Sequence, residues 1–150
     1  MPLIAVATNL AATTQTIMSK AAVDTNIMLY ALDNFYPVKQ AIAIDLISDC
    51  PYFCSQNLSE FANVCLRRWK FPKEKVADIL TNYLRQCNYV AVSEQMIFSA
   101  AEIMKLHHFQ FFDSIIISAA LASNCSILYS EDMSDGQVIQ NKLRIVNPFK

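Results

Sequence analysis

The sequence predicts an α/β fold of three α/β/α layers, in which helices cover both faces of a short central parallel sheet of four to five strands. Short apolar segments alternate along the chain with longer segments whose apolar residues recur at helical spacing. Strands without a polar face are typical of parallel strands that helices bury on both sides. The chain has 150 residues, 54% of them hydrophobic, which suits one domain with a substantial core.

The expected strands are short, and the first of them ends directly before Asp24-Thr25-Asn26. In order along the chain, the strands are 20–23, 52–54, 89–92, 126–129 and 143–146. Parallel strands point the same way, so their carboxyl ends share one edge of the sheet. Ligands bind at that edge in this class of fold.

Helices are expected in the first three intervals between strands. One or two buried turns at 27–32 follow the first strand. Pro37 suits the first turn of the next helix, and Pro72 begins another, because the first turn needs no free N–H. A helix capped by Ser55 or Asn57 continues from the second strand to about Trp69.

Two further helices are expected in the second half of the chain. Glu94 opens one that continues to about His107. Residues 109–112 connect it to an almost wholly apolar helix, 115–122, with Asp113 at its start. A polar loop, 130–137, follows the fourth strand.

The first 17 residues differ in character from the rest. No charged residue precedes Lys20, and a run of threonines interrupts the apolar stretch. A membrane-spanning helix needs about 20 apolar residues, and a secretory signal begins with positive charge. We therefore expect residues 1–17 to be an extension that is either flexible or not native, residues 18–150 to form one domain, and no association with a membrane.

Composition excludes several classes of function. The chain has one glycine, Gly136, so glycine-rich phosphate loops and the dinucleotide-binding fingerprint are absent. Its five cysteines are odd in number and contain no C-x-x-C pair, which favours a reducing, cytoplasmic location over a disulfide framework. The formal net charge is -1, so any contact with nucleic acid must depend on a local basic patch or on metal ions.

Acidic residues follow several of the expected strands. Asp24 comes after the first strand and Glu60 lies early in the helix after the second. Asp132 and Asp135 lie in the loop after the fourth strand, and Asp113 joins them if its connector reaches the same edge. Clustered carboxylates repel one another unless a cation lies among them. Hard oxygen ligands of this kind suit Mg²⁺ or Mn²⁺.

Each acid also has an ordinary structural interpretation, which the spacing alone leaves open. Asp24 and Asp113 can cap helices. Glu60 can interact with a helix dipole, and the two aspartates beside Gly136 can belong to a turn. The acids lie on separate elements but are expected at the same edge of the sheet. This grouping favours a metal site over separate structural roles.

The main basic cluster is Arg67, Arg68 and Lys70, on the helix that carries Glu60. It can be a solvated helix end or a track for the phosphates of RNA. Trp69 can stack on a base or close a core.

The chain resembles PIN-domain ribonucleases, and within them the toxins of VapBC-type toxin–antitoxin pairs. The resemblance covers about residues 20–149. The segments that carry it are Val23-Asp24-Thr25-Asn26, Ser59-Glu60-Phe61, Phe112-Asp113-Ser114-Ile115-Ile116, Leu128-Tyr129-Ser130-Glu131-Asp132, Asp135-Gly136-Gln137-Val138 and Arg144-Ile145-Val146-Asn147-Pro148-Phe149. The leader before Met18 departs from the family pattern, in which the first aspartate lies near the start.

The resemblance implies a role for each site residue. The acids that match catalytic metal ligands are Asp24, Glu60, Asp113 and Asp132. Asp135 shares the metal or holds it through water, and Thr25, Asn26 and Ser130 support the ligands. The implied reaction is hydrolysis of RNA phosphodiester bonds with Mg²⁺ or Mn²⁺. The implied partners are RNA, a cognate antitoxin that inserts a basic side chain among the acids, and a second copy of the chain.

Two alternatives stay open at this point. One is a PIN-domain nuclease of RNA processing outside a toxin–antitoxin pair, and the other is a non-catalytic module that binds RNA or protein. A haloacid dehalogenase-like phosphatase is disfavoured because Asn26 stands where the second aspartate is needed.

Overall fold

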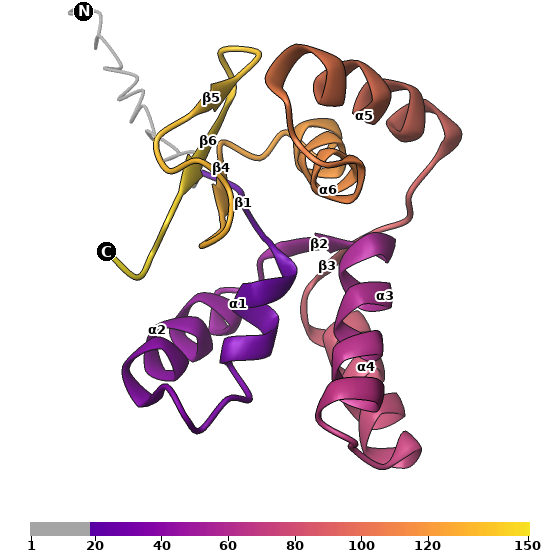
Figure 1. Cartoon of the computed structure of the whole chain (residues 1–150), viewed down its shortest axis with the longest axis vertical. Coiled ribbons are helices and arrows are strands. Elements are labelled where there is room, and N and C mark those ends of the chain that lie inside the picture. Colours follow the sequence, from indigo (N-terminus) through magenta and orange to yellow (C-terminus); the bar gives the residue numbers. More distant parts are fainter. Residues whose placement is uncertain (1–18) are drawn as a thin grey trace, which may run out of the picture.

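The computed structural model describes residues 19–150, and the extension expected over residues 1–17 lies outside the described residues. A six-stranded sheet with the order β3-β2-β1-β4-β6-β5 forms its centre (Figure 1). The strands are β1 (Ala21–Val23), β2 (Tyr52–Cys54), β3 (Asn88–Val90), β4 (Ile127–Tyr129), β5 (Val138–Ile139) and β6 (Leu143–Val146). The helices are α1 (Thr25–Tyr30), α2 (Pro37–Ser48), α3 (Ser55–Asn63), η1 (Val64–Arg68), α4 (Lys73–Gln86), α5 (Glu94–His107) and α6 (Phe111–Ala122).

The sheet is parallel except at one edge. β1, β2, β3, β4 and β6 pair in parallel, and β5 pairs antiparallel with β6. The predicted parallel sheet is therefore confirmed, and the sequence prediction lacked only β5. That strand has two residues, too few to show an alternating pattern.

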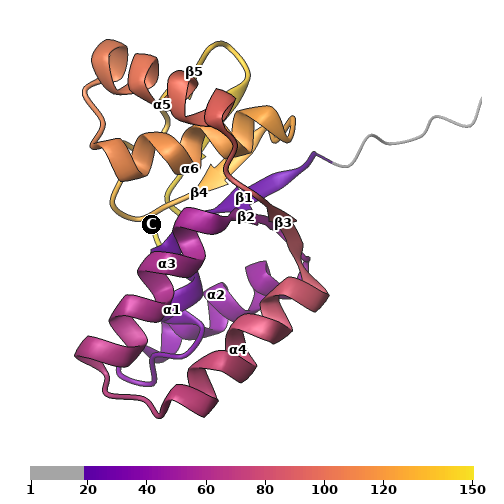
Figure 2. The ribbon, with the colours of Figure 1, turned by 90° about the vertical axis from the view of Figure 1, so that its right-hand side faces the viewer.

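Successive strand residues face opposite layers of helices, as the pleat of a strand requires. Ala22 and Cys54 pack in the core formed with α5 and α6. Their neighbours Val23 and Phe53 pack in the core formed with α1, α3 and α4. Figures 1 and 2 show α5 and α6 on one side of the sheet and α1 to α4 on the other. The expected three layers are thus present.

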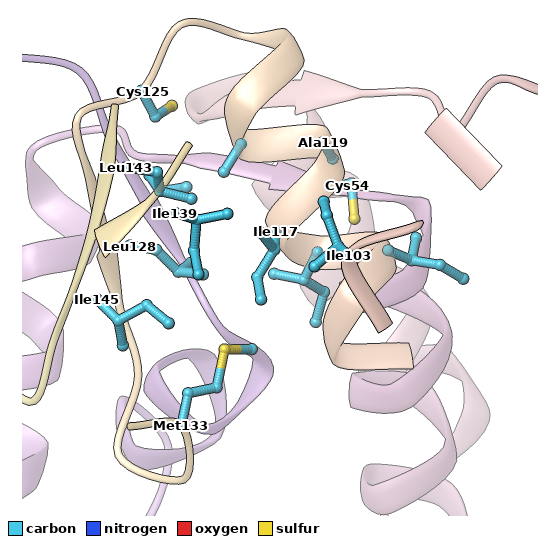
Figure 3. Close-up of a cluster of buried hydrophobic side chains, with 14 of the residues drawn as sticks. Cys54, Ile103, Ile117, Ala119, Cys125, Leu128, Met133, Ile139, Leu143 and Ile145 are labelled. Atoms are coloured by element: carbon cyan, nitrogen blue, oxygen red, sulfur yellow. The ribbon is translucent and has the colours of Figure 1, made fainter. Parts of the chain in front are cut away.

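Helix α6 fills the first of these cores. It is buried from Ser114 to Ala120, which explains why its sequence is apolar on all sides. In Figure 3, Ile117 of α6 lies between Leu128 and Ile145 of the sheet and Ile103 of α5. This packing fixes the start of α6, and with it Asp113, against the carboxyl edge of the sheet.

The sequence predicts one helix that continues to about Trp69, but the regular α-helix α3 ends at Asn63. At η1 it widens into a π-turn, in which the Trp69 N–H donates to the Val64 carbonyl oxygen at 3.0 Å. A π-turn inserts one residue per turn and rotates the residues that follow it. The directions of Arg67 and Arg68 therefore cannot be read from the α-helical spacing to Glu60.

Within residues 19–150, no helix combines the length and apolar character needed to span a membrane.

Candidate functional site

Asp24 lies at the centre of the site, where β1 ends and α1 begins. As the N-cap of α1, it accepts the Thr25 backbone N–H at 2.7 Å. Its other oxygen accepts the Ser130 hydroxyl at 2.7 Å and the Asn26 side-chain amide at 3.2 Å. The residue is only 5% exposed. Burial raises the pKa of Asp24 to about 7, with smaller contributions from the charges of Asp113 and Glu60.

Glu60 reaches the site from α3 and is half-buried. One of its oxygens accepts the Thr25 hydroxyl at 2.8 Å, and the other accepts the Gln56 side-chain amide at 2.9 Å. The carboxylate is thus oriented from two elements, α1 and its own helix. Gln56 was not among the residues that the sequence analysis singled out.

Asn57 holds the start of α3 against β1. Its amide donates to the Val23 carbonyl oxygen at 3.1 Å, and its oxygen accepts the Cys54 N–H at 2.8 Å. The side chain is fully buried. The sequence predicts Ser55 or Asn57 as the N-cap; in the structure Cys54 is the N-cap, and Asn57 is the N3 residue of a capping box with it.

Asp113 lies in the first turn of α6 and is half-buried. Burial raises the pKa of Asp113, and the charges of Glu60 and Asp132 raise it further. The contact of α6 with α3, which carries Glu60, fits a carboxylate near the same edge of the sheet as the other acids. The connector expected at 109–112 is shorter than that, because α6 begins at Phe111.

Asp132 lies in the loop after β4 and is exposed. It accepts a hydrogen bond from the Asn26 side-chain amide at 3.1 Å, so the same amide contacts both Asp24 and Asp132. The Ser130 hydroxyl oxygen also accepts the Met133 N–H at 3.2 Å, which closes the turn that contains Asp132. The structure thus brings Asp24, Glu60, Asp113 and Asp132 to one place, with Thr25, Asn26 and Ser130 between them.

Asp135 lies apart from these four acids. One of its oxygens accepts the Asn147 N–H at 2.8 Å, and the other pairs with the Lys150 ammonium at 3.3 Å. The Asn147 hydrogen bond is the main cause that lowers the pKa of Asp135. The geometry therefore ties Asp135 to the C-terminal segment rather than to Asp24.

The loop that carries Asp132 has a second support, which sequence patterns did not indicate. Glu131 forms an ion pair with Lys39 of α2 and accepts the Tyr30 hydroxyl at 2.5 Å. The Lys39 ammonium lies over the rings of Tyr30 at 4.8 Å and Phe149 at 5.4 Å. These contacts join α1, α2 and the C-terminal segment to the residue next to Asp132.

A divalent cation fits the chemistry of the four acids. In residues 19–150, no lysine, arginine or histidine forms an ion pair with any of them, so their mutual repulsion has no protein cation to offset it. No three His, Cys, Asp or Glu side chains in that range stand close enough to hold an ion directly. Mg²⁺ does not require three, because it keeps several waters and binds through one or two carboxylates.

The basic residues differ in their relation to the site. Arg68 and Trp69 line a pocket of about 280 Å³ that Asn26 and Asp132 also line. Arg67 and Lys70 are exposed and do not line this pocket. The predicted basic track is thus adjacent to the acids through Arg68.

The fold and the acids define the chain as a small α/β domain with a carboxylate site at the carboxyl edge of its sheet. The chain belongs to the PIN domain family, whose model matches residues 21–134. No curated protein sequence matches it significantly.

Several solved structures share the fold. One is a toxin–antitoxin complex from Klebsiella pneumoniae, with a TM-score of 0.66 and 14% identity, covering 88% of this chain and 99% of that chain. A second is VapC20 from Mycobacterium tuberculosis, a toxin that cleaves the sarcin–ricin loop, with a TM-score of 0.61 and 17% identity, covering 75% of this chain and 92% of that chain. A third is VapBC2 from Rickettsia felis, bound to a DNA fragment from its promoter, with a TM-score of 0.54 and 22% identity, covering 75% of this chain and 87% of that chain.

Proposed function

We propose that this chain is a metal-dependent endoribonuclease toxin that hydrolyses RNA phosphodiester bonds. The observation that carries the proposal is the grouping of Asp24, Glu60, Asp113 and Asp132 around Thr25, Asn26 and Ser130, with no ion pair to a protein cation within residues 19–150. Membership of the PIN domain family supports a nuclease. The fold of this chain is similar to that of VapC20, which supports RNA as the substrate and a toxin as the class of protein.

In the proposed site, some residues bind the metal ion and others orient those ligands. Asp24 and Asp132 are the ligands best placed to hold Mg²⁺ or Mn²⁺ together, because the Asn26 amide contacts both carboxylates. An ion held by these residues would activate a water and would neutralise charge on the phosphoryl oxygens. Ser130 fixes the rotamer of Asp24 through its hydroxyl.

Glu60 and Asp113 complete the donor set from the helices on either side. The Thr25 hydroxyl fixes one oxygen of Glu60. The half-buried Asp113 faces the charges of Glu60 and Asp132, so it shares in attracting the cation. None of these groups needs to form a covalent bond with the substrate.

A cleavage assay tests the nuclease. Purified protein is expected to cut single-stranded RNA with Mg²⁺ or Mn²⁺ and to stop when a chelator is added. Asp24→Asn and Asp113→Asn should each lower the rate by at least about 100-fold while the circular dichroism spectrum stays that of the parent. Glu102→Gln is the matched control, because this acid lies in a surface pair with Lys105 on α5. Folded Asp24 and Asp113 variants that cut as fast as the parent would contradict the proposal.

We further propose that a cognate antitoxin binds this chain. Four carboxylates without a protein cation attract a basic side chain, as the resemblance implies, and the solved neighbours include toxin–antitoxin complexes. Inhibition of cleavage by the protein encoded beside this chain tests the partner. A chain that cuts RNA but is not inhibited would instead fit RNA processing outside a toxin–antitoxin pair.

We also propose that the chain forms a homodimer in the cytoplasm. Large apolar side chains stay exposed on α5 and at the start of α6, among them Phe98, Leu106 and Phe112, and a second copy can cover them. All five cysteines are free, which is typical of a reducing compartment. Sedimentation of the parent and of Phe98→Asp tests the dimer.

A further inference from the structure

Two neighbouring pockets beside the acids share Trp69 as a common wall. The first, of about 280 Å³, is lined by Asn26, Tyr36, Arg68 and Asp132. The second, of about 350 Å³, is lined by Phe35, Phe71 and Lys75. Asp33 and Trp69 line both. The pockets therefore form one path that starts at Asp132 and passes Trp69.

The path is lined by aromatic rings, by the two cations Arg68 and Lys75, and by the acids Asp33, Glu131 and Asp132. Arg68 lines the first pocket, and no salt bridge holds it within residues 19–150. In the second pocket, the Lys75 ammonium lies 3.8 Å from the centroid of the Phe71 ring. Grooves that bind single-stranded nucleic acid contain such cations and rings, because cations follow the phosphates while aromatic faces stack on the bases.

Core packing does not explain why a phenylalanine occupies position 35. Its side chain is 92% exposed, so it contributes little to the core. Its turn is nonetheless formed by specific contacts, since the Phe35 N–H donates to the Asp33 side chain at 3.0 Å. A large aromatic side chain presented in this way beside a pocket is available for stacking on a ligand.

We propose that this path, from Asp132 past Arg68 and Trp69 to Phe35, binds the RNA strand on one side of the cleaved bond, with a base in each pocket. The proposal rests on the nuclease function proposed above. Trp69 and Phe35 stack on bases, and Arg68 contacts the phosphate nearest the acids. Arg68 and Trp69 in the lining next to Asp132 favour a nucleotide over an apolar peptide side chain.

Trp69 is the only tryptophan of the chain, so its fluorescence reports directly on the path. The probe is an oligouridylate of about eight nucleotides, added to the full chain in EDTA so that no cleavage occurs. The parent should show quenching of the Trp69 emission as the RNA binds. Phe35→Ala and Arg68→Ala should weaken this binding by about tenfold each. The Arg68 variant should also lower the slope of log K against log salt by about one.

Matched controls use residues that line neither pocket. Ile44→Ala removes another exposed apolar side chain, on α2, and Arg85→Ala removes another exposed arginine, on α4. Both should bind the oligouridylate as the parent does. Because Phe35 is almost fully exposed, its variant is expected to fold normally, and an unchanged melting temperature confirms this.

Two results would overturn the proposal, and neither is the same as failure of the nuclease function. Trp69 emission that RNA leaves unchanged would show that the pockets serve something else, such as a partner protein. Phe35 and Arg68 variants that bind like the parent would show that RNA lies elsewhere. If RNA quenches Trp69 but Mg²⁺ and Mn²⁺ support no cleavage, the path stands and the nuclease proposal fails.

Discussion

Asp24 makes the stability of the protein depend on pH. Its pKa is about 7 in the folded state against an ordinary value of 3.8, mainly because the residue is buried. The folded state therefore binds this proton more tightly than the unfolded state. The stability that the proton confers is fully present below pH 3.8 and is lost as the pH rises through 7.

This shift gives a prediction for Asp24→Asn in EDTA. Relative to the parent, the free energy of unfolding of the variant should rise by up to about 4 kcal/mol between pH 4 and pH 8. Urea denaturation at both pH values measures the difference. Adding Mg²⁺ at pH 8 should stabilise the parent and leave the variant nearly unchanged. A difference that stays constant with pH would show that Asp24 ionises normally.

Asp135 offers a second test at this scale. Its carboxylate binds the Asn147 N–H and the Lys150 ammonium, away from the other acids. Asp135→Asn should keep most of the cleavage activity and should lower the midpoint of unfolding slightly, because the C-terminal segment loses a charged hydrogen bond. Loss of cleavage as complete as in Asp113→Asn would place Asp135 among the metal ligands after all.

Among the elements, α3 depends on one buried amide. Asn57 joins the N-terminus of α3 to the ends of β1 and β2. Asn57→Ala leaves the Cys54 N–H and the Val23 carbonyl oxygen without this buried partner. The variant should be destabilised by about 2 kcal/mol, measured by urea denaturation. Asn63→Ala, at an exposed position of the same helix, should change stability by less than about 0.5 kcal/mol.

The elements also show what the sequence can and cannot predict. Apolar runs and helical spacing predicted the parallel strands and most helices, because burial on both faces leaves a strong pattern. The same patterns predicted that Asp24 and Asp132 lie close together, because both follow parallel strands. The π-turn at η1 left no such pattern, so the direction of Arg68 required coordinates. The contacts of Lys39 with Glu131 also required them, since they join residues from distant parts of the chain.

At the scale of the whole molecule, two cores share one sheet. The core around α6 and the core around α1 and α3 lie on opposite faces of the same strands. Loss of one core would expose one face of those strands, so the two are expected to unfold together in a single transition. Within residues 19–150, which the structure describes, both cores, the four acids and the path past Trp69 can be identified. The site therefore depends on the sheet as a unit rather than on either layer.

We predict that residues 18–150 fold and act as one domain. A chain that begins at Met18 should unfold in one transition at the melting temperature of the full chain, because every core residue identified in the structure is retained. It should also cut RNA with Mg²⁺ at the rate of the full chain, since β1 still places Asp24 beside Ser130. Calorimetry and the cleavage assay measure the two properties on the same preparation. If the shortened chain melts lower by several degrees, residues 1–17 contribute to the fold. If it melts at the same temperature but cuts more slowly, those residues act on the site or on RNA instead.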